Sequence, residues 1–330
     1  MSRRTARQAR VRAGFFLAAA LASILGLGGC ISLPQTEALR AKPPAGLPLR
    51  VELTEVPFHS QDLEFLCGPA ALATVISAAG VPATIESIAP LVYLPGREGS
   101  LQAEMLGATR RSGLVAYTLA PQLEAVLQEV AAGTPVVVLV NLTLSPIWLF
   151  PVWHYAVVVG YDLERERIVA RSGPIKREDI SFGLFEFLWQ DSDHWSMVAL
   201  PPGRVPATAR EPEFAAAVAA LEQAGRQAEA RESYRALLAR WPDNLVGLIG
   251  LGNVEYTLKD MAAAERAFRR ASEAQPQSAI AFNNLAHVLA LLGRLADAES
   301  AARTAVALGG PTLPEARKTL EAILASPAKP

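Results

Sequence analysis

The sequence predicts an α+β domain followed by an all-α domain built of repeats, and three observations lead to this prediction. Apolar residues recur at helical spacing between residues 68 and 132, β-branched runs of strand length follow between residues 135 and 200, and a 34-residue repeat lies beyond residue 211. A length of 330 residues with 51% hydrophobic residues is enough for about two domains of about 150 residues each.

Residues 1–29 have the pattern of a signal peptide. Five arginines lie in the first twelve residues, no acidic residue precedes Glu37, and an apolar run of 15 residues extends from Ala13 to Leu27. This run is too short to span a membrane comfortably. It ends in Leu-Gly-Gly-Cys at Cys30, which resembles a bacterial lipobox and implies that Cys30 is lipidated. An ordinary signal peptide that ends near a cysteine is the alternative.

Residues 30–48 are predicted to be a flexible tether, because four prolines lie between Ser32 and Pro48. Ile31, rather than an aspartate, follows Cys30. In a Gram-negative bacterium this is compatible with sorting to the outer membrane. The predicted location is therefore the cell envelope, with a lipid anchor at Cys30 and the protein on the periplasmic face.

A helix is predicted to begin at Cys67. Leu72, Val75, Ile76 and Ala79 fall on one helical face, Pro69 fits the first turn, and Gly80 ends the helix. Cys67 then lies at the N-terminus of a helix, where the macrodipole and free N–H groups favour a thiolate. A thiolate is the nucleophile of acyl transfer.

Residues 49–200 are predicted to form one domain with helices first and antiparallel strands second. Gly99-Ser100 caps the start of one helix, Gly113 and Gly133 each end a helix, and the β-branched runs predict the strands. The predicted helices span 85–91, 101–112, 121–132 and 182–189, and the predicted strands span 49–58, 135–142, 154–162, 166–172 and 195–200.

Residues 201–210 are predicted to be a linker, because prolines and a glycine interrupt the chain there. Residues 211–325 repeat with a period of 34: Ala230, Ala264 and Ala298 correspond, and Pro242 corresponds to Pro276. This pattern resembles the tetratricopeptide repeat, with about three units. A coiled coil is excluded because glycine and proline interrupt the pattern.

Two further residues form a hypothetical site with Cys67. The side-chain amide of Gln61 is expected to join the Cys67 backbone N–H in an oxyanion hole. His154 opens an apolar strand and is the expected base. Among the four histidines, a loop role is favoured for His59 and His194, and a surface or packing role for His287 within the repeats.

The motifs Gln61-x5-Cys-Gly-Pro-Ala-Ala-Leu and His-Tyr-Ala-Val-Val-Val-Gly-Tyr-Asp from His154 resemble the papain-like cysteine peptidases related to the bacteriocin double-glycine leader peptidases. The resemblance covers residues 49–200. It implies a papain-like fold, with the cysteine helix packed on the sheet that carries the histidine. It also implies peptidase activity through Cys67 and His154. The double-glycine specificity is not carried over, since no exporter sequence follows.

The resembled family places an aspartate on the strand after the histidine strand, whereas this chain has Arg171-Ser172-Gly173 there. Ser172 is the nearest polar residue that could hold the imidazole tautomer. Asn141 and Asp162 are outside candidates, and the turn position of Asp162 argues against it. A slow enzyme or a pseudoenzyme is therefore an open alternative. The apolar segment from Leu142 to Trp153 is either a flap over the cleft or part of the core.

The chain has two cysteines, so a lipidated Cys30 leaves Cys67 without a disulfide partner. A nucleophile explains such a thiol in an oxidising compartment, although many free cysteines are simply buried apolar residues. Removing the five N-terminal arginines from the 31 basic residues leaves 26 against 32 acidic ones, which argues against a nucleic-acid partner. The sequence has no metal-binding motif, no phosphate-binding glycine loop and no sign of a cofactor.

The predicted function is an envelope-anchored cysteine peptidase whose repeat module binds a protein partner or substrate. One alternative is a non-catalytic peptide-binding scaffold of an envelope complex. A second alternative keeps the thiol chemistry and acts on the cell wall as an amidase or acyltransferase.

Overall fold

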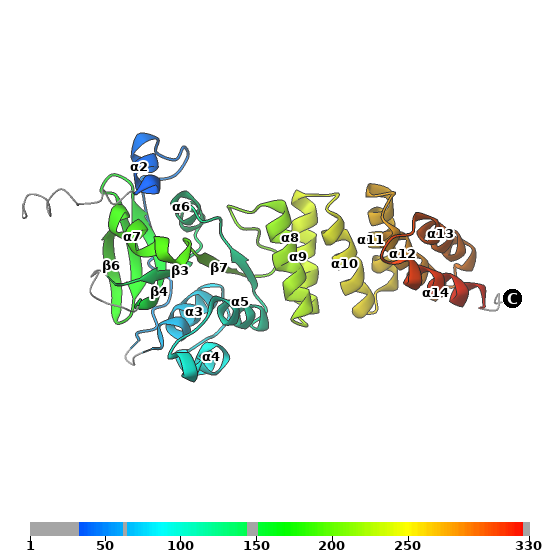
Figure 1. Cartoon of the computed structure of the whole chain (residues 1–330), viewed down its shortest axis with the longest axis horizontal. Coiled ribbons are helices and arrows are strands. Elements are labelled where there is room, and N and C mark those ends of the chain that lie inside the picture. The colour runs from blue at the N-terminus through cyan, green and yellow to red at the C-terminus, as the bar shows by residue number, and fades with distance from the viewer. Residues whose placement is uncertain (1–32, 62–64, 144–150, 326–330) are drawn as a thin grey trace, which may run out of the picture.

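The computed structural model describes residues 33–61, 65–143 and 151–325, and it contains a sheet domain followed by a row of helices (Figure 1). Within these residues, seven strands form one antiparallel sheet in the order β2-β7-β3-β4-β5-β6, and β1 pairs with the far end of β4. The strands are β1 (Arg50–Glu52), β2 (Val115–Thr118), β3 (Val136–Asn141), β4 (Trp153–Asp162), β5 (Arg167–Ser172), β6 (Ile175–Ser181) and β7 (Ser196–Leu200).

Helices cover both faces of this sheet. One face packs against α3 (Cys67–Ala78) and α5 (Gln102–Arg111), on which α4 (Ile85–Val92) packs in turn, and the other face packs against α6 (Leu123–Ala131) and α7 (Phe182–Trp189). On α3, the predicted face is buried: Leu72, Val75 and Ile76 pack against alternate residues of β4. This alternation follows from the two-residue period of a strand, which sends successive side chains to opposite faces.

Two strands were not predicted, and one prediction was too long. β2 is only four residues long, lies between two helices and pairs with β7 at the sheet edge, and β6 carries mostly exposed charged residues. The strand predicted over residues 49–58 is limited to Arg50–Glu52. The domain up to residue 135 is therefore not wholly helical.

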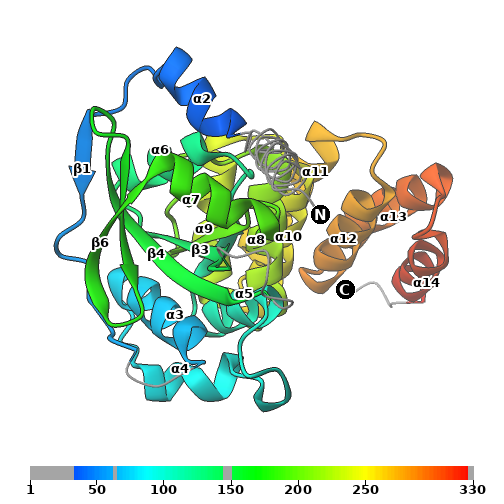
Figure 2. The ribbon, with the colours of Figure 1, turned by 60° about the vertical axis from the view of Figure 1, so that its left-hand side comes forward.

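The prediction of a flexible tether is wrong for the described part of residues 30–48. Helix α2 (Pro34–Ala41) packs against α6 and α7 beside the sheet (Figure 2). Pro34 suits the first turn, where its missing N–H costs nothing. Thr36 is fully buried there. Proline content alone could not reveal this docking, because the contacts come from residues more than eighty positions away.

In the described part of the chain, seven helices follow the sheet domain, and they pair as the 34-residue repeat predicts. Three hairpins are formed by α8 with α9, α10 with α11, and α12 with α13, and α14 packs on the last of them. The corresponding residues Ala230, Ala264 and Ala298 are fully buried where paired helices touch. The helices are α8 (Glu211–Gln223), α9 (Gln227–Arg240), α10 (Leu245–Thr257), α11 (Met261–Ala274), α12 (Ala279–Leu291), α13 (Leu295–Leu308) and α14 (Leu313–Leu324).

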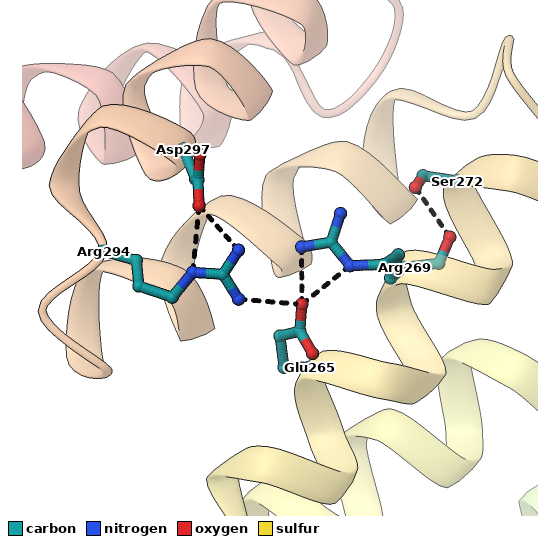
Figure 3. Close-up of polar contacts among 5 residues, drawn as sticks. All are labelled: Glu265, Arg269, Ser272, Arg294 and Asp297. Atoms are coloured by element: carbon teal, nitrogen blue, oxygen red, sulfur yellow. Dashed lines mark hydrogen bonds and ion pairs between the residues drawn. The ribbon is translucent and has the colours of Figure 1, made fainter.

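Successive hairpins are also joined by ion pairs at their surface. Between α11 and α13, Glu265 accepts hydrogen bonds from both Arg269 and Arg294, and Arg294 also binds Asp297 (Figure 3). These side chains are mostly half-exposed, so each pair contributes little by itself. A shared network fixes the orientation of one repeat against the next.

The first repeat is continuous with the sheet domain. Phe214 and Val218 of α8 lie in the same apolar core as Tyr117 of β2. The connection over residues 201–210, predicted as a linker, is held by the Glu129 carboxylate, which accepts hydrogen bonds from the N–H and hydroxyl of Thr208. The sheet domain and the first repeat therefore share one core.

None of the helices in the described ranges is both long and apolar enough to cross a bilayer.

Gly250 of α10 tests the packing of the repeats. A Cβ at this position would lie 2.1 Å from Cζ of Tyr234, whose hydroxyl donates to Glu222 and so fixes the ring. Gly250→Ala is expected to lower the free energy of unfolding by about 1–3 kcal/mol through overpacking. Denaturant unfolding followed by circular dichroism measures this change.

Gly107→Ala in α5 is the matched control, because its new Cβ would meet only the flexible end of Arg111. This variant is expected to be neutral or stabilising, by up to about 1 kcal/mol, since alanine favours a helix over glycine. Equal losses in both variants would contradict the packing described for Gly250.

Candidate active site

Cys67 is the first residue of α3, as predicted. Phe65, two residues earlier, has a φ of 67°, which turns the chain sharply into the helix. Gly68 is required by close contact: a Cβ there would lie 2.4 Å from Oγ of Ser100. The Cys-Gly-Pro sequence therefore brings the sulfur to the helix N-terminus while the helix packs tightly against the loop before α5.

Two opposing effects act on the Cys67 thiol. Burial raises its pKa above the ordinary value, while hydrogen bonds from the backbone N–H groups of Tyr155 and Gly68 lower it. Burial is the larger effect, so the net shift is upward. This partial burial of Cys67 therefore opposes the thiolate that the helix N-terminus was predicted to favour.

His154 is the second residue of β4, and its Nε2 lies 3.0 Å from the hydroxyl oxygen of Ser172 at the end of β5. This contact leaves Nδ1 as the nitrogen available for proton exchange with another group. Burial lowers the pKa of the imidazole below its ordinary value. At neutral pH the thiol and the imidazole are therefore both favoured in their uncharged forms.

Ser172 is the predicted partner that the fold brings to His154. The two outside candidates are used elsewhere: Asn141 donates to Asp191 and accepts from the backbone N–H of Val152, and Asp162 accepts from the N–H of Arg165 in the β4–β5 turn. Asp162 also lies at the opposite end of β4 from His154. Among the described residues, no carboxylate is hydrogen-bonded to His154.

Gln61 is held beside Ser172 through the backbone, because its N–H donates to the carbonyl of Gly173 over 3.2 Å. Gln61, Cys67 and His154 all line one cavity of about 870 Å³. The cavity lies at the end of β4, where residues from the α3 side meet residues that follow α7. It is therefore bordered from both faces of the sheet, and this brings Cys67 and His154 to a common space.

The cavity has an apolar rim. Phe65, Leu101, Val152 and Trp153 line it, and each exposes more than a third of its surface, with Val152 at 46% and Trp153 at 45%. Charged side chains also border it: Arg97, Glu98, Asp191 and Asp193. An apolar rim beside the Cys67 thiol suits a ligand with a large apolar side chain.

Two residues near the sulfur were not singled out from the sequence. The backbone N–H of Tyr155 lowers the pKa of the Cys67 thiol, and the hydroxyl of Tyr155 donates to the carbonyl of Ser100. Arg171 is only 6% exposed and lines a small cavity with Cys67 and Ser172, and among the described residues its guanidinium donates one hydrogen bond, of 3.4 Å, to the carbonyl of Thr54. Their positions in the sequence could have indicated them, because Tyr155 follows His154 and Arg171 precedes Ser172.

The remaining histidines have other contacts. His59 Nε2 lies 3.3 Å from Ser77 Oγ, the His194 ring packs edge-on against Trp189, and His287 contacts Tyr256. Cys30 and residues 144–150 of the expected flap lie outside the described residues. No cluster of three or more histidine, cysteine or carboxylate groups suited to a metal ion occurs in the ranges that the structure describes.

Comparison with known proteins addresses both parts of the chain. The sheet domain overlaps a Bacillus anthracis protein described as a C39-like peptidase, at 18% identity and a TM-score of 0.39, over 46% of this chain and 98% of that one. The helical part overlaps the Yersinia enterocolitica type III secretion chaperone SycD, solved with a peptide of the translocator YopD, at 21% identity and a TM-score of 0.32, over 34% of this chain and 91% of that one.

A third overlap, again with the helical part, is with the first tetratricopeptide domain of Spaghetti (RPAP3) bound to an HSP90 peptide. It has 22% identity and a TM-score of 0.33, over 35% of this chain and 94% of that one. No curated protein matches the chain. Residues 53–190 match the model of the Peptidase_C39 like family. This segment is therefore similar to the C39-like peptidases, as its two motifs predict.

Proposed function

We propose that residues 49–200 form a cysteine peptidase with Cys67 as nucleophile, His154 as base and Gln61 in the oxyanion hole. The observation that supports this most is that these three residues line one cavity, while His154 is held from behind by Ser172. A nucleophile, a base and an oriented second partner of the base are what a thiol hydrolase requires.

The uncharged resting pair suggests how the reaction begins. As Sγ attacks the peptide carbonyl, the thiol proton moves to Nδ1 of His154, so the charges form only in the transition state. The Gln61 amide and the Cys67 N–H donate to the developing oxyanion. His154 then gives its proton to the leaving amine, and water, deprotonated by His154, hydrolyses the thioester.

Ser172 limits this proposed mechanism. A hydroxyl orients an imidazole but stabilises an imidazolium less than a carboxylate does, so turnover is expected to be slow. The apolar rim of Val152 and Trp153 favours substrates with a bulky apolar side chain near the scissile bond. The proposed substrate is therefore a peptide segment with apolar side chains, which the enzyme hydrolyses slowly.

The proposed setting is the bacterial envelope, with Cys30 lipidated and residues 1–29 removed as a signal peptide. The repeats over residues 211–325 would bind a protein partner. Exposed apolar residues recur there with the repeat period: Val246 corresponds to Ile280, and Leu258 to Leu292. Repeated exposed apolar positions are typical of a surface that binds protein.

A non-catalytic scaffold is the second candidate, favoured by the absence of a carboxylate beside His154 among the described residues. It predicts that Cys67→Ala leaves the cellular phenotype intact while disruption of the repeats abolishes it. Muropeptides assayed beside peptides would identify the third possibility, an amidase or acyltransferase acting on the cell wall.

Replacing the nucleophile tests the peptidase directly. Cys67→Ala is expected to lower hydrolysis of apolar fluorogenic peptides by roughly 10³-fold or more, because no other group forms the thioester. Iodoacetamide should inactivate the wild type, whereas a fluorophosphonate should not. Ser112→Ala at the end of α5 is the control and should retain full activity; full activity in Cys67→Ala would exclude the mechanism.

The pH dependence of Cys67 alkylation tests the uncharged resting pair. Because burial raises the thiol pKa, the thiolate fraction should rise by about tenfold per pH unit between about pH 6 and 8, without a plateau. Intact-protein mass spectrometry with iodoacetamide measures the rate. A plateau already reached below about pH 7 would instead indicate a thiolate–imidazolium pair.

Ser172 variants test the role of the hydroxyl. Ser172→Ala is expected to lower kcat by roughly three- to tenfold, the effect of losing one hydrogen bond of about 1 kcal/mol. Ser172→Asp should raise both kcat and the pKa of His154, because a carboxylate stabilises the imidazolium. NMR titration of His154 reads the pKa. An unchanged kcat in both variants would show that Ser172 has no part in positioning the base.

A further inference from the structure

We propose that the edge of the sheet domain formed by α2, the start of α7 and the β4–β5 turn rests on the bilayer surface. This inference depends on the lipidation of Cys30 proposed above. In this arrangement the sheet domain is not freely tethered but is held close to the membrane in a fixed orientation.

The first step is the attachment of α2 at its N-terminus. Glu186 of α7 is only 2% exposed, and its two carboxylate oxygens accept hydrogen bonds from the backbone N–H groups of Gln35 over 2.8 Å and of Thr36 over 2.7 Å. A carboxylate that receives the free N–H groups of a helix start is strongly favoured there. The charge is buried because α2 covers it.

Further contacts pin both ends of α2. The Gln35 side chain accepts from the N–H of Leu123 and donates to the carbonyl of Pro121. At the other end, the Arg40 guanidinium makes two parallel hydrogen bonds to the Glu166 carboxylate in the β4–β5 turn. The helix is therefore fastened to three separate parts of the domain.

The second step is the short distance to the lipid. Leu33 packs closely on Gly183 in the first turn of α7, where a Cβ would lie 3.0 Å from Cδ1 of Leu33. Leu33 is three residues from Cys30. Three extended residues reach at most about 10 Å, so the lipid cannot lie far from the start of α7. A docked α2 leaves almost no free tether.

The third step is the chemistry of this edge. Leu49 is 60% exposed and Leu184 is 42% exposed, and both lie beside α2 or at the start of α7. A hollow of about 350 Å³ opens under the helix, with the apolar residues Leu39, Pro43, Leu49, Leu163 and Phe182 in its lining. Exposed apolar groups next to the exposed cation Lys42 suit a bilayer interface. The lining of the hollow also includes Glu164 and Glu166, and Glu166 is paired with Arg40.

This orientation has a consequence for the active site. The cavity residues Asp191 and Asp193 follow the C-terminal end of α7, which is eight residues or about 12 Å long. One border of the cavity therefore lies about 12 Å from the start of α7, while α4 lies on the opposite side of the domain from α2 (Figure 2). The orientation would hold this border at a fixed distance from the membrane surface.

The test uses the lipidated full-length protein in vesicles, with Cys67→Ser as background and one added cysteine carrying a nitroxide label. Accessibility to oxygen, which concentrates in lipid, is compared with accessibility to a water-soluble nickel complex. The label at Leu184→Cys is expected to favour oxygen at least about threefold more than the control label at Glu86→Cys on exposed α4. Equal accessibility at the two sites would overturn the inference.

Two further variants separate the possible failures. A ten-residue Gly-Ser insertion after Ser32 lengthens the tether without touching α2, and it should abolish the difference between the labels while the protein stays in the membrane fraction. Glu186→Gln should do the same and should also speed hydrogen exchange at Gln35 and Thr36. Persistence of the difference after insertion would overturn the inference. Mass spectrometry that finds no lipid on Cys30 would overturn the proposed anchor and this inference together.

Discussion

The packing of α3 on β4 joins the helix that begins with Cys67 to the strand that carries His154. The rest of the site depends on this junction. It requires α3 to approach the loop before α5 so closely that only glycine fits at position 68. It also brings His154, the neighbour of Tyr155, to the same cavity as Cys67. Burial also shifts the pKa of each group toward its uncharged form.

Local patterns were enough to predict the elements that carry the site. The helical face of Leu72 and Ile76, the β-branched run after His154 and the 34-residue repeat are each encoded within a short window, and the structure contains all three. β6, with mostly exposed charged residues, has no such pattern. The docking of α2 and the charge state of Cys67 depend on distant residues, Glu186 in one case and the surrounding fold in the other, so short-range reasoning could not reach them.

The two parts of the chain form one continuous unit. Tyr117 of β2 packs edge-on against Phe214 of α8, its hydroxyl donates to the carbonyl of Thr208, and it accepts from the N–H of Arg210. Because the first repeat completes the core of the sheet domain, its orientation relative to the cavity is fixed by packing rather than by a loose linker. A partner bound by the repeats would therefore be held in a defined position relative to Cys67.

The central claim is that Cys67 and His154 act together on a peptide carbonyl, and a peptide carrying an electrophilic vinyl sulfone beside a bulky apolar residue tests this most directly. Peptide mapping should locate the adduct on Cys67, and His154→Ala should slow its formation by at least about tenfold, because the thiol loses its base. An adduct that forms equally fast without His154, or no adduct at all on the folded protein, would contradict the claim.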